Sequence, residues 1–467
     1  METRMQALVS RSRATCVAVL LLVGIGMAQT KNPTAMAAPS AGELGLRSGP
    51  LVGYAEMTEV ALWVQTTRPA NVQFRYWTEG QTQSSALSPV VSSTTEGDCI
   101  ARVVLAGLEL GTKYNYELYI DGKLVARPYR LAFQTQPLWQ WRTDPPAFTV
   151  AIGSCAYINE TEYDRPGTPY GGEYEIFTAI AAKQPEVMLW LGDNIYYREP
   201  EFYSVAQMRR RYAHDRALPE WQALFGATHH YAIWDDHDFG PNDSNWTYRM
   251  KQDALTVFKS YWANPIYGIE GVPGVFFNFL WDDVEFFMLD DRYYRSPNAL
   301  PDASEKVMFG KAQLHWLKES LAASQAPFKI VAGGNQMLNP LTPAEAFGNF
   351  PLEQAELLEW IKSRKISGVV FLSGDRHQTE LIRLEDKDLY PLYDYTSSPL
   401  TSGTHAAGKD AVNPARVPGT FVTEKRNFGL LRFSGPRTDR LLTMECYDKT
   451  GKLLWTHAVK AKDLKPK

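Results

Sequence analysis

Four short polar motifs, each placed where an apolar run stops, constrain this chain more than any other feature of its sequence. The apolar runs are typical of β-strands and cover Phe148 to Ile152, Val187 to Leu191, Tyr231 to Trp234 and Val369 to Leu372. The motifs read Ile152-Gly-Ser-Cys155, Leu191-Gly-Asp193-Asn-Ile-Tyr196, Trp234-Asp-Asp-His237-Asp238 and Leu372-Ser-Gly-Asp375-Arg-His377. In an open α/β sheet, loops at the carboxyl ends of strands converge on one crevice. We therefore expect side chains from four distant segments to share one site.

The side chains in these motifs include four kinds of metal ligand. Hard cations prefer carboxylate oxygens, whereas iron and similar ions also accept imidazole, phenolate or thiolate. The motifs supply all four, for example in Asp193, His377, Tyr196 and Cys155. The sequence therefore predicts a metal centre at these strand ends.

The motifs also resemble those of known enzymes. Gly192-Asp193-Asn-Ile-Tyr196 resembles the Gly-Asp-x-x-Tyr motif of the calcineurin-like metallophosphoesterases, in which the Asp bridges two metals and the Tyr, in purple acid phosphatases, binds ferric iron. A narrower resemblance, to the alkaline phosphatase D (PhoD-like) family, lies in the order of Gly153-Ser-Cys155, Trp234-Asp-Asp-His237, Leu289-Asp-Asp-Arg292-Tyr-Tyr-Arg295, Gly334-Asn-Gln336 and Ser373-Gly-Asp375-Arg-His377. This resemblance runs from about residue 50 to the C-terminus.

The resemblance implies one ferric ion (Fe³⁺) and one or two further cations, for which Ca²⁺ is the expected identity. The candidate metal ligands are Cys155, Asp193, Tyr196, Asp236, Asp375 and His377. Thiolate and phenolate donors suit Fe³⁺ better than Mg²⁺ or Ca²⁺. By position, Asp236 replaces an asparagine of the wider superfamily and Asp375 replaces a histidine, which shifts the site toward the oxygen ligands that Ca²⁺ prefers. Tyr197 is the alternative phenol, and Asn242 and Asp243 either add ligands or form a turn.

Catalysis and substrate binding have partly different candidates. Asp193 and His237 are candidate catalytic residues, and His237 is the group expected to protonate the departing alkoxide. Arg376 is expected to stabilise phosphate charge or to pair with an acidic side chain. Arg292 and Gln336 are candidate substrate contacts. Alternatively, Arg292 forms a buried ion pair. Gln336 stands where the superfamily usually has a metal-binding histidine, so that ligand is expected to be lost.

Residues 49–136 show the two-residue period of β-strands, for example at Val60, Leu62 and Val64. Such alternation, broken at short intervals by Gly, Pro and Asn, is typical of an all-β sandwich. The segment from Gly107 to Tyr116 also resembles the strand-entry motif of fibronectin type III domains. The sequence therefore predicts an N-terminal fibronectin III-like domain over residues 49–136, as the resemblance to PhoD-like enzymes implies.

Beyond a proline-containing linker, residues 147–467 alternate between strand and helix patterns. Apolar residues recur at intervals of three and four residues in three segments, Glu173 to Gln184, Gly310 to Ser324 and Leu352 to Arg364. Such spacing is expected of amphipathic helices. The fold class is therefore α/β. The resemblance implies a four-layer α/β/β/α metallophosphoesterase sandwich that forms a PhoD-like catalytic domain.

Residues 1–38 are expected to be a secretory signal peptide. Arg4, Arg11 and Arg13 precede the apolar run Val17 to Met27, which is followed by small residues that end in Ala35-Met-Ala37-Ala38. A transmembrane anchor needs roughly 20 apolar residues, and this run is shorter. We therefore expect a secreted or periplasmic protein with no transmembrane segment in its mature chain. In that oxidising compartment, Cys99 and Cys446 either form a disulfide or occupy buried strand positions.

Composition and charge narrow the class of partner. Of the 467 residues, 45% are hydrophobic and 21% are charged, and the formal net charge is −4. Nucleic-acid binding depends on the neutralisation of phosphates by Lys and Arg, and the sequence has no cluster of these residues. The expected partners are small-molecule or lipid phosphate esters, with no nucleic acid. No feature of the sequence predicts an oligomeric state.

Together these features predict a secreted, metal-dependent phosphoesterase similar to alkaline phosphatase D. It would hydrolyse phosphomonoesters, phosphodiesters or both by attack of a metal-bound hydroxide, in the service of phosphate scavenging. A narrower alternative is a phosphodiesterase or phospholipase D-type enzyme that acts on lipid or wall-polymer diesters. Two rivals of other classes are a secreted binding or adhesion protein with an inactive phosphatase-like domain, and an iron oxidase or peroxidase. The intact polar positions at four strand ends favour the hydrolase.

Overall fold

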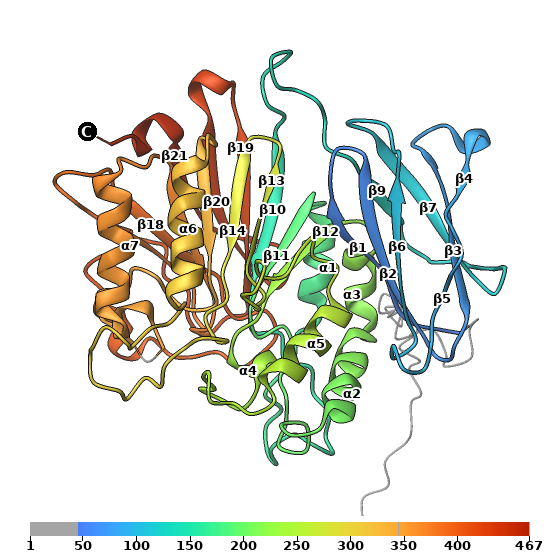
Figure 1. Ribbon diagram of the computed structural model, residues 1–467, viewed down its shortest axis with the longest axis horizontal. Helices are drawn as coiled ribbons and strands as arrows, with labels where there is room; N and C mark the ends of the chain where they lie inside the picture. Colours follow the sequence, from blue (N-terminus) through green and yellow to red (C-terminus); the bar gives the residue numbers. More distant parts are fainter. Residues whose placement is uncertain (1–44, 344, 467) are drawn as a thin grey trace, which may run out of the picture. The chain divides into compact units, whose positions relative to one another are not determined.

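The computed structural model describes residues 45–343 and 345–466 (Figure 1). The predicted signal peptide, residues 1–38, lies outside the described residues. Within the described part of the chain, no helix is both long enough and apolar enough to span a membrane.

A nine-stranded sheet carries three of the four predicted motif strands. Its order is β21-β20-β19-β10-β11-β12-β1-β2-β6. The strands are β1 (Leu46–Ala55), β2 (Glu59–Thr66), β6 (Ile100–Ala106), β10 (Phe148–Gly153), β11 (Val187–Leu191), β12 (His229–Ile233), β19 (Asn427–Ser434), β20 (Leu441–Asp448) and β21 (Leu453–Lys460). β10, β11 and β12 run parallel. Their carboxyl ends therefore lie at the same edge of the sheet, as the sequence predicts.

A six-stranded sheet carries the fourth motif strand. Its order is β13 (Phe277–Trp281), β14 (Val284–Met288), β15 (Phe328–Ala332), β16 (Val369–Ser373), β18 (Leu392–Thr396) and β17 (Glu380–Leu384). β14, β15, β16 and β18 are parallel. Strands buried on both faces form continuous apolar runs, and every residue of β11, β15 and β16 is buried.

Seven α-helices connect these strands in the described residues. They are α1 (Glu175–Ala182), α2 (Val205–Arg216), α3 (Pro219–Phe225), α4 (Asp236–Phe239), α5 (Lys251–Tyr261), α6 (Lys311–Ala323) and α7 (Pro351–Ser363). α1 packs against α3, α2 against α5, and α6 against α7 (Figure 1). Pro351 begins α7, where its fixed φ suits the first helical position and its missing N–H costs nothing. The three helices expected from apolar periodicity are thus present, with ends that differ by one or two residues.

The N-terminal part of the described chain is all-β but shares a sheet with the rest. A second group of strands, β3 (Asn71–Thr78), β4 (Ala86–Leu87), β5 (Val91–Ser92), β7 (Lys113–Ile120), β8 (Lys123–Val125) and β9 (Ala132–Gln134), forms its own sheet. Burial alternates along β7, as the two-residue period predicts. β1 and β2, however, belong to the nine-stranded sheet, because β1 pairs in parallel with β12.

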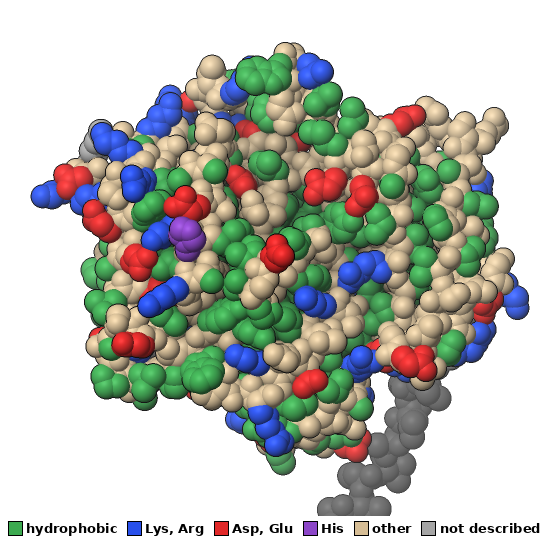
Figure 2. All heavy atoms as spheres, in the orientation of Figure 1, with side chains coloured by type: hydrophobic (Ala, Val, Ile, Leu, Met, Phe, Trp, Pro, Cys, Tyr) green, Lys and Arg blue, Asp and Glu red, His purple; other side chains and the backbone are tan. Residues whose placement is uncertain are grey.

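Of the two alternatives for Cys99 and Cys446, the disulfide is not formed. Both are free thiols. Cys446 is buried in β20, and Cys99 is half-buried in the turn before β6. On the face drawn in Figure 2, Lys and Arg side chains are interspersed with Asp and Glu. This face therefore lacks the concentrated positive charge on which nucleic-acid binding depends.

Candidate metal centre

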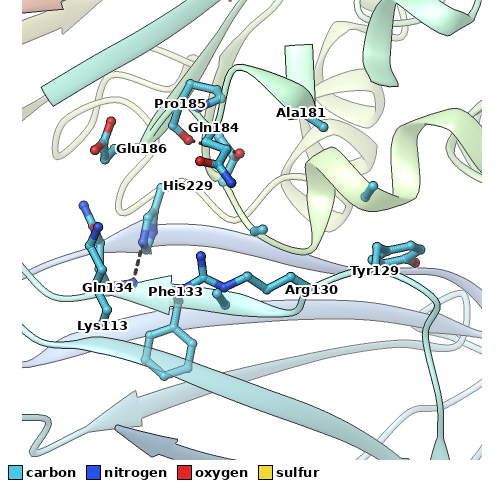
Figure 3. A pocket seen from close by; sticks show the side chains of 14 residues that line it. Lys113, Tyr129, Arg130, Phe133, Gln134, Ala181, Gln184, Pro185, Glu186 and His229 are labelled. Carbon is cyan, nitrogen blue, oxygen red and sulfur yellow. Dashed lines mark hydrogen bonds between the residues drawn. The ribbon is translucent and has the colours of Figure 1, made fainter. Parts of the chain in front are cut away.

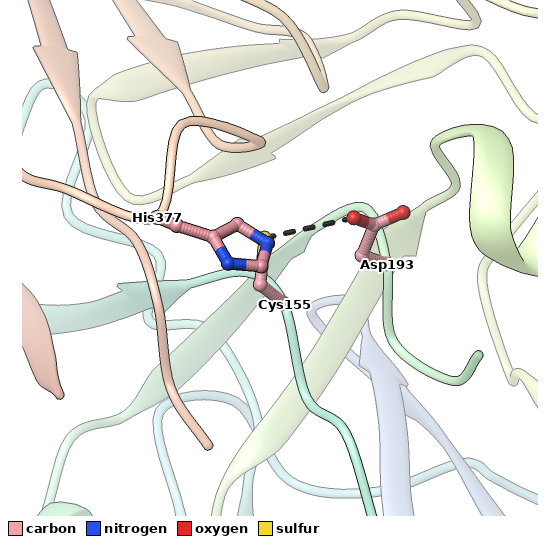
Figure 4. A group of neighbouring side chains, drawn as sticks. All are labelled: Cys155, Asp193 and His377. Atoms are coloured by element: carbon pink, nitrogen blue, oxygen red, sulfur yellow. Dashed lines mark hydrogen bonds between the residues drawn. The ribbon is translucent and has the colours of Figure 1, made fainter. Parts of the chain in front are cut away.

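Loops from both sheets bring four predicted ligands into contact. Cys155 follows β10, Asp193 follows β11 and His377 follows β16 (Figure 4). Tyr196 lies three residues after Asp193 in the same loop. The Cys155 thiol donates to Asp193 Oδ2 at 3.6 Å, and the Tyr196 hydroxyl donates to the same oxygen at 3.1 Å. Tyr196 Oη also lies 3.3 Å from His377 Nε2. The ligand atoms of Cys155, Asp193 and His377 all lie within 4.8 Å of one another.

Tyr196, rather than Tyr197, supplies the phenol at this centre. The hydroxyl of Tyr197 is buried with no hydrogen-bond partner in the described part of the chain. Its ring belongs to the large apolar core, whereas Cys155, Tyr157 and Tyr196 form a small separate cluster.

The backbone at the candidate ligands is held in a costly conformation. Cys155, Asp193, Asp375 and His377 have φ values of 62°, 52°, 63° and 53°. This left-handed region costs a non-glycine residue about 1–2 kcal/mol. Such residues cluster at functional sites, where surrounding structure over-determines them. The strained residues here lie in the three loops that follow β10, β11 and β16, and the ligand atoms of Cys155, Asp193 and His377 converge.

The electrostatic environment of these side chains favours the binding of a cation. Burial, followed by the nearby charges of Asp236, Asp238 and Asp375, raises the pKa of Asp193 well above its ordinary value. Burial, then Glu345, raises the pKa of Asp375 to about 8. A cation among these carboxylates would offset both causes. The donor set therefore fits a bound metal ion.

The thiol and the phenol fit the same interpretation. Burial and the charge of Asp193 raise the pKa of both Cys155 and Tyr196 well above their ordinary values. Metal ligation requires the deprotonated forms, so metal binding at this centre would release protons.

A second potential ligand group shares Asp193 with the first. Ligand atoms of Asp193, Asp236 and His237 lie within 4.8 Å of one another. The backbone N–H of His237 donates to Asp193 Oδ1 at 3.2 Å, and its ring lies 4.2 Å from the ring of Tyr196. Burial lowers the pKa of His237, although Asp236 and Glu345 act in the opposite direction. The neutral imidazole that burial favours is also the form that binds metals.

A third group contains a residue that the sequence interpretation missed. Carboxylate atoms of Asp236, Asp243 and Glu345 lie within 4.8 Å of one another. The Asp243 backbone N–H donates to Asp236 Oδ2 at 2.7 Å, so Asp243 forms the turn that was one of its two predicted roles. Glu345 lies in an irregular loop after β15 and carries no motif, so no sequence signal pointed to it.

Arg292 lies in an ion pair, which favours the second interpretation of this residue. Its side chain is buried and donates to both carboxylate oxygens of Glu345, at 2.9 and 3.0 Å. Its Nε donates to Asp235. Burial alone would raise the pKa of Glu345, but the charge of Arg292 outweighs this effect and lowers it. A guanidinium engaged in this way has no free fork for a phosphate.

Gln336 requires a correction, because its amide is fully used inside the protein. The side chain is completely buried. Its Nε2 donates to Glu380 and to Thr396, both at 2.9 Å, and its Oε1 accepts from Asn339 at 2.7 Å. It fixes the loop after β15 to β17 and β18 and offers no group to a substrate.

Arg376 is also engaged, but less completely. Its guanidinium pairs with Asp410 at 2.8 Å, and its Nε is buried without a partner in the described residues. The predicted alternative of an acidic partner is therefore observed, and one N–H remains free.

Groups around the ligands hold them in place, and most of these groups had no sequence signal. Tyr170 Oη lies 3.1 Å from His377 Nδ1, which also contacts the carbonyl oxygen of Gly403 at 2.5 Å. The Ser398 hydroxyl donates to Cys155 Sγ at 3.2 Å. Such outer contacts set the orientation and tautomer of metal ligands.

A cavity of about 330 Å³ lies beside these side chains, lined in part by Tyr157, Tyr170, Tyr196 and His237. Another cavity, of about 340 Å³, lies between β9 and the amino ends of β11 and β12 (Figure 3). There His229 Nε2 accepts from the Gln134 N–H at 3.1 Å, and burial lowers the pKa of His229 to about 4. Asp193, Tyr196 and Asp236 follow the opposite, carboxyl ends of β11 and β12, and none of the candidate ligands lines this second cavity.

Comparisons with known proteins agree with the motif order. Residues 150–436 match the family model described as PhoD-like phosphatase, and residues 43–138 match a domain of unknown function. Alkaline phosphatase D of Bacillus subtilis (strain 168) is 21% identical over 388 residues, and the match covers 69% of this chain and 65% of that protein. The chain thus spans less than two thirds of the length of this curated relative.

Two solved structures share the fold. The structure of PhoD superposes with a TM-score of 0.72 at 18% identity, covering 91% of this chain and 93% of that chain. A purple acid phosphatase from yellow lupin (Lupinus luteus) seeds superposes with a TM-score of 0.62 at 10% identity, covering 89% of this chain and 76% of that chain. At these identities the likeness is one of fold: a mixed α/β structure with several sheets.

Proposed function

Because the chain belongs to the PhoD-like phosphatase family, we propose that it is a metal-dependent hydrolase of phosphoric ester bonds. The observation that carries the proposal is the contact of Cys155, Asp193, Tyr196 and His377 across loops from two sheets. Burial of a thiol, a carboxylate, a phenol and an imidazole in one cluster is unfavourable because each loses its contact with water. They do suit an iron-like ion.

The proposed ligands of Fe³⁺ are Cys155, Asp193, Tyr196, Asp375 and His377. Asp193 and Asp236 would hold a second ion, proposed to be Ca²⁺; a ligand atom of His237 lies within 4.8 Å of theirs, and Asp243 belongs to a further group with Asp236 and Glu345. Bound metal ions supply Lewis acidity and lower the pKa of a coordinated water. The supporting observation is that several carboxylates are buried close together, and that burial and their neighbours raise the pKa of Asp193 and Asp375.

The chain's own side chains have three tasks in this proposal. Asp193 fixes the two ligand groups relative to each other, since both of its oxygens are engaged. His237 is the proposed proton donor to the departing alkoxide; burial lowers its pKa, and Asp236 and Glu345 act in the opposite direction. Arg376, whose guanidinium pairs with Asp410 at 2.8 Å, is proposed to stabilise developing negative charge on phosphate. Water attacks phosphorus directly, and no side chain serves as the nucleophile.

The proposed substrates are phosphomonoesters, phosphodiesters or both, with the phosphodiesterase or phospholipase D-type activity as the narrower alternative. We further propose secretion and a role in phosphate scavenging, as the predicted signal peptide implies. For the fold, we propose that residues 49–136 form a fibronectin III-like domain and residues 147–467 a four-layer catalytic domain. The separate sheet around β3 and β7 and the antiparallel pairing of β1, β2 and β6 support the first assignment.

The test compares two variants of the metal-loaded protein. Asp193→Asn should lower kcat by at least about 100-fold and reduce bound metal, because it weakens both ligand groups. His237→Ala should keep its iron and lose about 100-fold in kcat, the lower end of the contribution typical of a general acid. Near-wild-type turnover of Asp193→Asn with its metals intact would show that the assignment of Asp193 is wrong.

A further inference from the structure

The cavity beside the candidate metal centre is built largely from aromatic rings. Tyr157 and Tyr170 meet edge to face, with ring centroids 5.0 Å apart and planes at 78°. Tyr196 lies 5.0 Å from Tyr157. Tyr163, Tyr197 and Phe202 add to the aromatic lining, and of these Tyr163 and Phe202 are half-buried. Because Tyr196 and His237 line the same cavity, a phosphate held at the metal centre would have its organic group directed into a ring-lined space.

The inner wall of this cavity contains a buried cation that is paired with a carboxylate. The Arg198 guanidinium lies 3.9 Å above the ring centroid of Tyr157 and pairs with Asp164 at 2.9 Å. The same guanidinium donates to the Ile158 carbonyl oxygen at 2.7 Å, and the Tyr157 hydroxyl donates to Asp164 at 2.7 Å. The side chain of Arg198 is only 4% exposed. Its charge is therefore neutralised by Asp164 within the wall, and the aromatic rings are the groups that a ligand in the cavity would contact.

The rim of the cavity is polar. Arg165, Thr168, Glu199 and Asn242 line it and are exposed, so donors and acceptors surround the ring-lined interior. An acyl chain would gain nothing from these groups and would favour an apolar lining throughout. A small polyol would leave the ring faces in contact with water. A flat ring with polar atoms at its edge satisfies both the interior and the rim, and its size suits a cavity of about 330 Å³.

We propose that this cavity binds a planar aromatic group of the substrate, so that the preferred esters carry a nucleobase or an aryl ring rather than a lipid chain or a polyol. The proposal rests on the proposed phosphoesterase function and narrows its substrate class. Aromatic side chains hold bases by stacking, whose strength depends little on the identity of the base. Tyr163 and Phe202 determine this preference and contact none of the candidate metal ligands in the described structure.

The test measures phosphate release from adenosine 5′-monophosphate and from glycerol 1-phosphate, which share a primary alcohol as leaving group. Wild-type kcat/KM should be at least about tenfold higher for the nucleotide. Tyr163→Leu and Phe202→Leu should each reduce that value by about tenfold, mainly through KM, and change the value for glycerol 1-phosphate by less than about twofold. Phenyl phosphate then distinguishes a general aryl preference from one for nucleobases.

The matched control is Tyr203→Leu, which removes a neighbouring exposed ring that does not line the cavity. It should alter neither substrate. Equal losses on both substrates, or none, in the Tyr163 and Phe202 variants would overturn the proposal while leaving the proposed function intact. Equilibrium dialysis with adenosine supplies a readout that needs no hydrolysis. If wild type hydrolyses no ester, the proposed function fails. Adenosine binding that the two variants weaken would still support an aromatic ligand of the cavity, whereas the absence of adenosine binding would overturn that proposal.

Discussion

Buried acidic groups dominate the candidate centre at the level of single residues. Burial is the largest cause of the raised pKa of Asp193, Asp235 and Asp375, and neighbouring carboxylates add to it. Two fully buried cations lie beside these carboxylates: Arg292 pairs with Asp235 and Glu345, and Arg295 lies 3.8 Å from Glu345. Residues of this kind are stable either when protonated or when a cation neutralises them.

This arrangement predicts a pH-dependent effect of metal removal. The pKa of Asp375 is raised from 3.8 to about 8, so between these values the native metal-free protein retains a proton that the unfolded chain releases. Its free energy of unfolding therefore falls as the pH rises through this window. Bound metal removes the penalty. The gap in Tm between metal-loaded and chelator-treated protein should widen by about 5 °C between pH 5 and pH 8. An equal gap at both pH values would contradict this account.

Single residues also show what the sequence could and could not reveal. Cys155, Asp193, Tyr196 and His377 were predictable because each directly follows an apolar strand within a motif. Glu345 and Tyr170 lie in irregular loops, so only the folded chain shows that they approach the centre. Gln336 occupies a motif position, yet its environment is internal, since Glu380, Thr396 and Asn339 satisfy its amide. A motif position does not reveal which way a side chain points.

At the level of elements, the strand ends position the ligands through close backbone approach. Gly192 separates β11 from Asp193 and has a φ of +91°. A Cβ at this position would lie 2.6 Å from Asp235 Cβ and 2.9 Å from Asp235 N. The loops after β11 and β12 therefore meet at a point where only glycine fits.

Gly192→Ala should damage both stability and activity. Gly80→Ala is the matched control, because Gly80 has a φ of +84° and open space around its missing Cβ. Both variants carry the left-handed penalty of about 1–2 kcal/mol. The clash at Gly192 should add about 1–3 kcal/mol and displace Asp193. Chemical denaturation and ester hydrolysis measure the two effects. If the two variants lose stability equally and both keep full activity, the close approach does not position the centre.

Most elements were predictable from apolar pattern, and the exceptions have physical causes. The predicted run Val187 to Leu191 is β11 itself. β12 begins at His229, two residues before the predicted start, because His229 and His230 are buried in neutral form. Burial lowers the pKa of these residues to about 4 and about 3, respectively. Two histidines look polar in a sequence, so the pattern concealed the beginning of this strand.

At the level of the whole described molecule, the N-terminal strands complete the catalytic sheet. Val52 of β1 pairs with His229 of β12, and the Ala55 N–H donates to the Tyr231 hydroxyl at 3.1 Å. His229 Nδ1 contacts the Gly53 carbonyl oxygen at 2.9 Å. The two-residue period predicts which face of a strand is buried, but not the sheet that the strand joins. For that reason the sequence could not show this pairing.

Deletion of residues 49–136 should therefore disrupt the remaining chain. It would expose the edge of β12 and leave the His229 ring without its backbone partners, which invites aggregation. We expect insoluble protein, or a Tm lower by at least about 10 °C, compared with the full chain. Soluble truncated protein with an unchanged Tm and unchanged activity would show that the N-terminal strands merely pack beside the catalytic sheet.

The central claim is metal-dependent hydrolysis of phosphate esters, and one experiment tests it most directly. Rates on a chromogenic phosphomonoester and the matching diester are measured side by side, with iron and Ca²⁺ added and with a chelator. The account predicts hydrolysis of at least one ester that the chelator abolishes and the metals restore, and the ratio of rates identifies the ester class. No turnover of either ester with both metals present, or turnover that the chelator leaves unchanged, would contradict it.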